Sequence, residues 1–238
     1  MDLRQLASID TALRVLVHPN TQISFSQFGE DMVVSALLLS LGRDRTPGFY
    51  VDVGALDPVY ASNTQMLFLR GWSGVNIDAN PDAIEKFRHA RPGDRNVHAA
   101  VSDREGEVEF DIYTVAGLST ADPAAKAAYA QDGRAKLARR LTLRTRRLAD
   151  ILAEHVPSWQ SIDLMSVDVE GMDLAVLRSN DWRRFAPYLL LVEDAALSLL
   201  DRPESEIFRF LRPLGYRLFS QTYITSIYVR DQPVTGDP

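Results

Sequence analysis

Apolar residues recur at spacings of three and four in two segments near the start of the chain, residues 1–17 and 29–41. This period places apolar side chains on one face of a helix. Residues 1–45 are therefore predicted to form an N-terminal helical segment that precedes the main fold.

From residue 49 onward, short β-branched and aromatic runs alternate with helical patterns. The predicted strands cover residues 49–53, 74–78, 97–102, 162–169 and 188–192. The predicted helices cover residues 63–70, 81–90, 172–178 and 203–211. Strands that alternate with helices predict a mostly parallel sheet with right-handed crossovers, which is an α/β fold of the Rossmann-like type.

The two last apolar runs, residues 216–220 and 226–230, are predicted to pair as a terminal antiparallel hairpin. Residues 107–147 fit the alternation poorly, because strand-like VEFDIYT precedes an Ala-rich charged stretch and then LTLRTRR. This region is predicted to be an insertion that forms a lid or a substrate wall. The chain, residues 1–238, is then expected to be a single domain.

Composition excludes several classes of protein. Apolar residues make up 46% and charged residues 24%, which is typical of a globular protein, and the absence of Cys excludes disulfides and thiolate metal sites. The N-terminus lacks the apolar core of a signal peptide, and residues 32–41 are about half a membrane span. The net charge of −6 disfavours nucleic acid as a partner. We expect a cytoplasmic protein without a membrane span, either a monomer or a homo-oligomer.

Small and acidic residues follow the first three predicted strands. Asp52, Gly54 and Ala55 end the first strand, Asp78 ends the second, and Asp103 follows the third. Ligands of open α/β sheets bind at this carboxyl edge. A single Gly in place of G-x-G-x-x-G does not support a pyrophosphate cradle, whereas S-adenosylmethionine (SAM) needs only a tight turn and carboxylates.

Each of these residues also has a structural interpretation. The first strand end could be a simple turn, Asp78 could cap the helix that begins at Pro81, and Asp103 could be a turn residue. We favour ribose binding for Asp78 and propose the adenine amino group as the partner of Asp103.

Further carboxylates gather at the ends of the next two predicted strands. Asp168 and Glu170 are two residues apart and point the same way, and Glu193 and Asp194 follow the neighbouring strand. Four such groups need a cation, a proton or wide access to solvent. Oxygen ligands suggest Mg²⁺ held by Asp168, Glu193 and Asp194, although Glu170 and Asp194 could equally be solvated loop residues.

Histidine is not expected to supply the general base. None of the four histidines is predicted at the carboxyl end of a strand: His18, His89, His98 and His155. Asp168 and Glu170 are therefore the candidate catalytic residues. Seven basic residues between Arg134 and Arg147 could form a solvated face, which we prefer, or a rim that attracts an anionic substrate.

Six short motifs follow one another along the chain: SQFGED at 26–31, YVDVGA at 50–55, Asp57-Pro58, Ser62-Asn63-Thr64, GWSG at 71–74 and DVEG at 168–171. In this order they resemble the FkbM-type SAM-dependent methyltransferases over about residues 24–195. The resemblance implies a class I SAM-methyltransferase fold and methyl transfer to a hydroxyl of a sugar, glycan or glycosylated small molecule. Asp78 stands where many relatives have Glu.

The strand ends and the resemblance together predict one set of cofactor-binding residues. The set is Gln27, Glu30, Asp52, Gly54, Ala55, Asn63, Asp78, Ala79, Ser102, Asp103 and Asp168. A more distant likeness to metal-dependent sugar O-methyltransferases of antibiotic pathways, through Asp168 and Glu193-Asp194, is the main reason to consider Mg²⁺. The alternatives are a non-catalytic SAM-fold binding module or partner subunit and, more weakly, a nicotinamide-dependent dehydrogenase.

Overall fold

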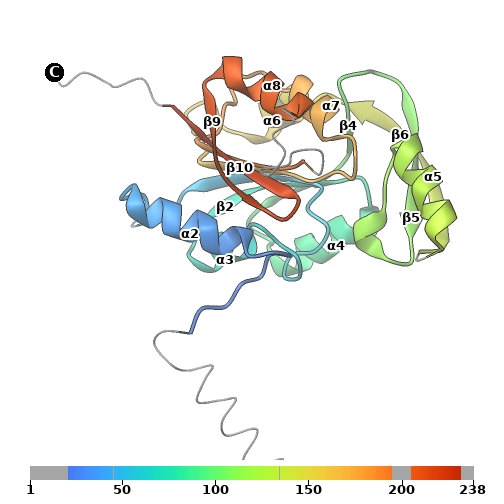
Figure 1. The fold of residues 1–238 in the computed structure, drawn as a ribbon, viewed down its shortest axis with the longest axis horizontal. Helices are drawn as coiled ribbons and strands as arrows, with labels where there is room; N and C mark the ends of the chain where they lie inside the picture. The colour runs from blue at the N-terminus through green and yellow to red at the C-terminus, as the bar shows by residue number, and fades with distance from the viewer. Residues whose placement is uncertain (1–20, 45, 134, 195–204, 232–238) are drawn as a thin grey trace, which may run out of the picture.

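A computed structural model describes residues 21–44, 46–133, 135–194 and 205–231 as a seven-stranded sheet with helices on both faces (Figure 1). The strand order is β3-β2-β1-β7-β8-β10-β9. These strands are β1 (Phe49–Val53), β2 (Ser73–Asp78), β3 (Arg95–His98), β7 (Leu164–Val167), β8 (Leu189–Glu193), β9 (Tyr216–Thr222) and β10 (Thr225–Arg230).

The sheet is parallel except at one edge, where β10 pairs antiparallel with both β8 and β9. Strand β1 lies between β2 and β7, so the chain leaves β1 in one direction and later returns to its other side. This reversal of strand order opens a crevice at the carboxyl edge, where ligands of doubly wound sheets bind. The predicted fold class, including the terminal hairpin, is confirmed.

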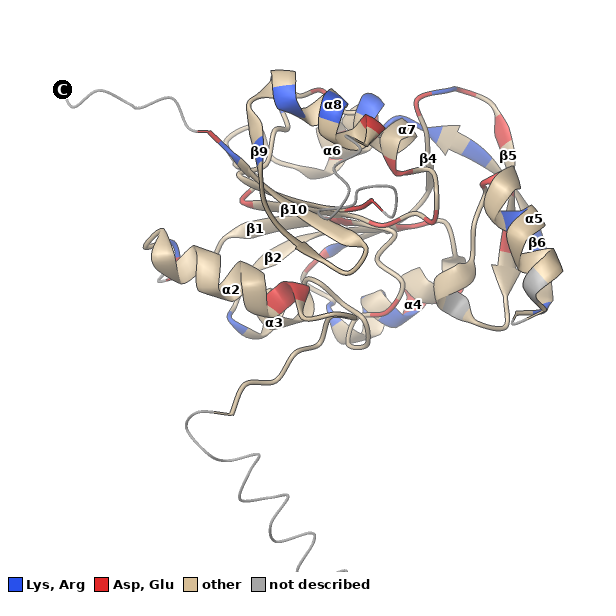
Figure 2. Ribbon diagram, in the orientation of Figure 1, with Lys and Arg blue, Asp and Glu red and all other residues tan. Residues whose placement is uncertain are grey.

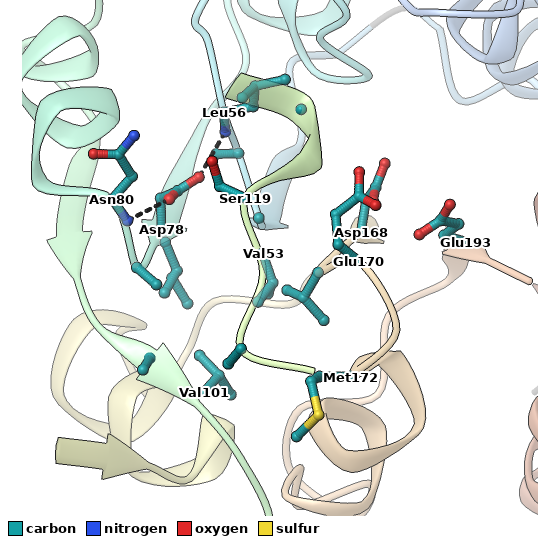
Figure 3. Close-up of a pocket in the computed structure, with 18 of the residues that line it drawn as sticks. Val53, Leu56, Asp78, Asn80, Val101, Ser119, Asp168, Glu170, Met172 and Glu193 are labelled. Atoms are coloured by element: carbon teal, nitrogen blue, oxygen red, sulfur yellow. Dashed lines mark hydrogen bonds between the residues drawn. The ribbon is translucent and has the colours of Figure 1, made fainter. Parts of the chain in front are cut away.

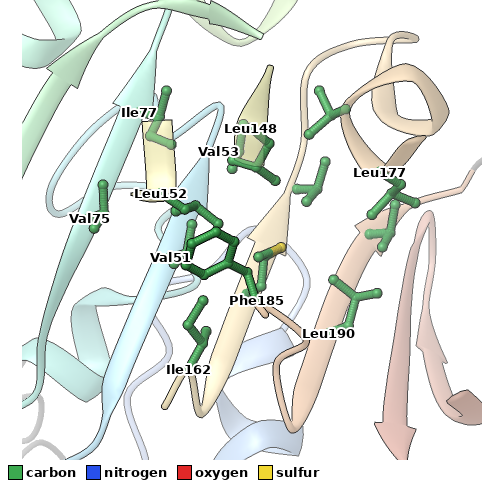
Figure 4. Close-up of a cluster of buried hydrophobic side chains, with 14 of the residues drawn as sticks. Val51, Val53, Val75, Ile77, Leu148, Leu152, Ile162, Leu177, Phe185 and Leu190 are labelled. Atoms are coloured by element: carbon green, nitrogen blue, oxygen red, sulfur yellow. The ribbon is translucent and has the colours of Figure 1, made fainter. Parts of the chain in front are cut away.

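Helices α2 (Glu30–Ser40), α3 (Gln65–Leu69) and α4 (Pro81–Ala90) cover one face of the sheet, and α6 (Leu148–His155), α7 (Asp173–Arg178) and α8 (Glu206–Leu211) cover the other (Figure 1). Side chains alternate between the two faces, as the pleat of a strand requires. Val51 and Val53 pack with Leu152 and Leu177 (Figure 4), whereas Tyr50 points to the opposite cluster.

The insertion forms a separate three-stranded sheet beside the main one, in the order β4-β6-β5 (Figure 1). Its elements are β4 (Ala100–Val101), β5 (Glu107–Tyr113), the 3₁₀ helix η1 (Ala116–Leu118), α5 (Pro123–Asp132) and β6 (Leu137–Arg146). Helix α5 begins where the Asp122 side chain accepts a hydrogen bond from the Ala125 N–H, and ends at Gly133 in the left-handed conformation.

Some sequence predictions are corrected by the structure. The predicted strand 97–102 is divided, because Ala100 and Val101 leave the main sheet to pair with Thr145 and Arg146 of the insertion. Helix α6 was missed. The predicted helix 203–211 begins at Glu206, capped by Ser205. The predicted helix 1–17 and residues 203–204 lie outside the described residues. Among the helices that the structure describes, none is long and apolar enough to cross a membrane.

Candidate active site

The carboxyl ends of β1, β2, β7 and β8 open into a cavity of about 580 Å³, which residues of the insertion also line. This volume is typical of small-molecule sites. Acidic side chains lie on two sides of this cavity (Figure 3). Asp78 is on one side, Asp168, Glu170 and Glu193 are on the other, and Val53 lies between them.

Backbone hydrogen bonds fix Asp78 at the end of β2. Its carboxylate accepts from the Leu56 N–H at 2.8 Å and from the Asn80 N–H at 2.6 Å (Figure 3). Burial raises the pKa of Asp78, and these two hydrogen bonds oppose the rise. Helix α4 is capped by the Asn80 side chain, which accepts from the Asp82 N–H, so the helix-cap interpretation of Asp78 is wrong.

The end of β1 approaches β7 so closely that only glycine fits between them. A Cβ atom added to Gly54, which has φ +79°, would lie 1.7 Å from the Asp168 carbonyl oxygen. Beside it, the buried Asp52 carboxylate accepts from the Thr64 hydroxyl at 2.7 Å, and burial raises the pKa of Asp52 to about 6. Asn63 donates to the Ser166 hydroxyl at 3.0 Å, which joins the following loop to β7.

A buried arginine holds that loop in place. Arg91 has no exposed surface, and its guanidinium donates to the Pro58 carbonyl, the Ser62 hydroxyl and the Gln65 amide oxygen. These contacts fix residues 58–65, which include the cavity-lining Asn63. The sequence alone gave no sign of this role, because the partners of Arg91 are 26 to 41 residues away.

The other side of the cavity holds closely spaced carboxylates. The Asp168 and Glu193 carboxyl groups lie close enough to shift each other's pKa. Burial raises the pKa of both groups, and repulsion from neighbouring carboxylates raises it further. Figure 2 shows acidic residues at the start of α2 and along loops between the main sheet and the insertion.

Glu170 stands in a tight loop at the end of β7 that the insertion holds from the other side. Its backbone has φ +53°, a conformation uncommon for a residue with a side chain. The Tyr129 hydroxyl donates to its carboxylate and the Thr120 hydroxyl to its carbonyl, both at 2.8 Å. Burial raises the pKa of Glu170 to about 7, against the lowering effect of the Tyr129 hydrogen bond.

The raised pKa values make stability depend on pH. Folded Asp52, Glu170 and Asp173 have pKa values of about 6, 7 and 7, above those of the unfolded chain, so their contribution falls as pH rises from about 4 to 7. The raised pKa of the buried Asp173 alone lowers the free energy of unfolding by about 2 kcal/mol between about pH 5.5 and about pH 8. We expect the Tm of the ligand-free protein, measured by calorimetry, to be about 4–8 °C lower at about pH 8 than at about pH 5.5. An equal or higher Tm at pH 8 would contradict these shifts.

The structure places most of the predicted site residues on the cavity wall. Those that line it are Gln27, Asp52, Gly54, Ala55, Asn63, Asp78, Ala79, Ser102, Asp168, Glu170 and Glu193. Two predicted cofactor residues do not line it. Asp103 is exposed on the turn after β4, whereas its neighbour Ser102 lines the cavity, so the predicted adenine contact of Asp103 gains no support from the structure. Glu30 is buried, where it accepts hydrogen bonds from the Phe28 N–H and the Thr222 hydroxyl.

The predicted metal site is not formed. Asp194 points away from Asp168 and Glu193, because its N–H bonds to the Ile224 carbonyl and its buried carboxylate accepts from the Ser205 hydroxyl. Successive side chains of a strand alternate in direction, which separates Asp194 from Glu193. In the part of the chain that the structure describes, no group of three or more His, Asp or Glu side chains could hold a metal ion. The Mg²⁺ prediction is therefore not supported.

One histidine departs from the prediction. His98 is the last residue of β3, at the carboxyl edge, where its ring Nε2 lies 2.9 Å from the Ala79 carbonyl oxygen. It is exposed and does not line the cavity, nor does any other histidine of the described residues. A carboxylate thus stays the candidate for a general base.

Three of the seven basic residues between Arg134 and Arg147 form ion pairs. Arg140 binds Asp111 at 2.6 Å, and Arg139 lies 3.0 Å from Asp82. Arg146 pairs with Glu154 in the same way, whereas Arg134 lies outside the described residues. This pairing agrees with the preferred interpretation as a solvated face.

Sequence comparison identifies the family. The model of the methyltransferase FkbM domain matches residues 52–218, well over half of the chain. The chain belongs to the FkbM methyltransferase family. The match extends from β1 into β9 and so includes the residues at the carboxyl ends of β2, β7 and β8. A search of curated proteins found no match.

Three solved structures show distant similarity to this FkbM-family chain. They are a TehB-like SAM-dependent methyltransferase from Corynebacterium glutamicum (11% identity, TM-score 0.40, 97% of this chain and 100% of that one), the Burkholderia thailandensis 1,6-didemethyltoxoflavin-N1-methyltransferase with bound 1,6-didemethyltoxoflavin and S-adenosylhomocysteine (12%, 0.39, 96% and 89%) and monomeric WbdD (13%, 0.38, 91% and 45%). At these values they do not bear on the substrate.

Several residues of the site were not found from the sequence. Tyr129 and Thr120 reach Glu170 from the insertion, 41 and 50 residues away in the chain, and Ser119 lines the cavity near them. Only the folded insertion brings these side chains to the end of β7. One feature of the sequence could have pointed to Tyr129 as a site residue: it is the single aromatic residue in the Ala-rich helix α5.

Proposed function

We propose that this FkbM-family protein transfers the methyl group of SAM to a hydroxyl of a sugar, a glycan or a glycosylated small molecule. The observation that carries the proposal is Glu170, a carboxylate with a pKa of about 7 that lines the cavity across from Asp78. A group of this pKa can accept a proton at neutral pH, as a general base for a hydroxyl must.

In this proposal the cofactor lies over the ends of β1 and β2. The fixed carboxylate of Asp78 accepts hydrogen bonds from the ribose hydroxyls, because each of its oxygens keeps a lone pair after binding a backbone N–H. Ala79 and Ser102 line the adenine side. Asp52 and Asn63 line the side for the amino acid moiety, and Gly54 lets the ligand approach the backbone.

The carboxylates suit a positively charged cofactor. Asp52 is buried, Asp168 and Glu193 are partly buried near it, and desolvation raises the pKa of all three. The sulfonium and ammonium charges of SAM would favour their ionised forms. We therefore expect SAM to bind more tightly at pH 8 than at pH 6.

The chemistry assigned to Glu170 is the removal of one proton. SAM supplies a methyl group on a sulfonium sulfur, and transfer forms the O–CH₃ bond while the S–CH₃ bond breaks and its electron pair stays on sulfur. The Glu170 carboxylate accepts the hydroxyl proton of the acceptor, and Tyr129 and Thr120 hold Glu170 in place. The rest of the acceleration comes from orientation of the two reactants in the cavity.

Removing the Tyr129 hydroxyl should change how the rate depends on pH. The hydrogen bond from Tyr129 lowers the pKa of Glu170, so Tyr129→Phe should raise that pKa and move the acidic limb of the kcat profile upward by about one pH unit. The matched control is Tyr113→Phe, whose ring packs edge-on against Tyr129 with centroids 5.6 Å apart. An acidic limb that stays in place in Tyr129→Phe would contradict the role of Glu170 as base.

Two measurements test the proposed function. Isothermal titration should show binding of SAM and none of NAD, which excludes the dehydrogenase. Incubation with SAM that carries a deuterated methyl group and a panel of glycosides should then give an O–CD₃ product by mass spectrometry. Binding of SAM with no transfer to any glycoside would instead indicate the non-catalytic binding module.

A further inference from the structure

Two exposed aromatic side chains lie in contact with each other beside residues that line the cavity. Phe28 is 42% exposed and Tyr223 is 78% exposed, and their ring centroids are 4.9 Å apart at an interplanar angle of 58°. We call this pair the aromatic rim. Contiguous exposed apolar surface marks interaction sites more often than singly exposed apolar residues do.

The aromatic rim continues directly into the cavity. Gln27 and Ile224, the chain neighbours of Phe28 and Tyr223, both line the cavity. The turn that carries Tyr223 follows β9, and the residue after Ile224 pairs in register with Glu193 of β8. The rim therefore lies on the side of the cavity that holds the carboxylates, away from Asp78.

The backbone at Tyr223 does not suit its side chain. Its φ of +42° is in the left-handed region, where a turn between two strands favours Asn or Gly over a bulky residue. With 78% of the residue exposed, burial in the core does not compensate for this strain. Strain of this kind is concentrated at functional sites.

A single buried carboxylate holds both parts of the aromatic rim. Glu30, 1% exposed at the start of α2, accepts from the Phe28 N–H at 2.8 Å with one oxygen. Its other oxygen accepts from the Thr222 hydroxyl at 2.7 Å, next to Tyr223. Two segments 192 residues apart in the chain are thus fixed at one spacing.

We propose that Phe28 and Tyr223 form the acceptor subsite and bind the sugar ring. A pyranose has an apolar C–H face, which packs on aromatic rings, and hydroxyls around its edge, which can bond to Glu170 and Glu193 inside the cavity. The two rings are tilted by 58° to each other, so their exposed faces offer apolar surface in two directions rather than one flat plane. The inference rests on the proposed function, since it names the part of the site that selects the acceptor.

The test measures sugar binding by saturation-transfer NMR in the presence of S-adenosylhomocysteine. The probes are methyl β-glycosides of glucose, galactose and mannose, with p-nitrophenol as a planar aromatic comparison. We expect Phe28→Ala and Tyr223→Asn to weaken binding of the glycosides by about tenfold or more, as for loss of a stacking contact. The affinity for S-adenosylhomocysteine should change by less than about twofold, because the rim is away from Asp78. The control is Trp159→Ala, which removes an exposed aromatic residue from the loop before β7, at the opposite edge of the sheet.

The Tyr223→Asn variant also separates binding from folding. Asn tolerates the left-handed backbone, so its Tm should equal or exceed that of the wild type while sugar binding is lost. Unchanged glycoside binding in both rim variants, no binding of any glycoside to the wild type, or preferential binding of p-nitrophenol would each overturn the subsite. Sugar binding that depends on the rim, without O–CD₃ product, would leave the subsite in place and contradict the transferase function.

Discussion

Glu170→Gln should lower kcat by about 10²–10⁴-fold, the usual contribution of a general base. Gln keeps the size of the side chain, and its amide oxygen can still accept the hydrogen bond that Tyr129 donates to Glu170 at 2.8 Å. The substitution therefore removes the proton acceptor with little change of shape. The measurement is the rate of methyl transfer to a glycoside acceptor at saturating SAM.

Two further measurements distinguish loss of the general base from loss of SAM binding or of any other carboxylate. The Kd for SAM should change by less than about threefold, because Glu170 faces the acceptor side of the cavity. Glu105→Gln, an exposed carboxylate on the turn before β5, should keep the wild-type rate. A fully active Glu170→Gln enzyme would leave orientation alone as the source of catalysis.

Asp78→Ala should weaken SAM binding by about 1.5–3 kcal/mol, which is about 10- to 150-fold in Kd. The substitution removes the acceptor for the ribose hydroxyls and also the anchor for the backbone N–H groups of Leu56 and Asn80. Both losses act on the cofactor half of the cavity. Isothermal titration with SAM measures the change.

Asp103→Ala is the matched control for this variant. Both residues are Asp at the carboxyl edge of the sheet, but Asp103 is exposed and does not line the cavity. The Kd of the Asp103→Ala variant for SAM should equal that of the wild type. If Asp78→Ala bound SAM as tightly as the wild type, Asp78 would have no part in the cofactor site.

The alternation of apolar runs was sufficient to predict the main sheet. Buried strands such as Phe49–Val53 are apolar through most of their length, and the helices between them carry an apolar face, so local pattern and global fold agree. Because a parallel sheet collects the ends of its strands at one edge, Asp52, Asp78 and Asp168 could be assigned to one site before the fold was known.

Prediction failed where contacts depend on distant segments. Ala100 continues an apolar run, yet it leaves the sheet because Thr145, 45 residues later, offers a backbone partner. Asp194 follows Glu193 directly, yet it is turned away by contacts with Ser205 and Ile224. Neither partner can be identified from local periodicity, which is why the metal site was predicted and is not formed.

A crystal structure with S-adenosylhomocysteine bound tests the central claim most directly. The account predicts the ribose hydroxyls within hydrogen-bonding distance of the Asp78 carboxylate, and the sulfur on the side of the cavity that holds Glu170. Space for an acceptor should remain between that sulfur and Glu170. A ligand whose ribose contacts other residues, or whose sulfur points away from Glu170, would contradict the account.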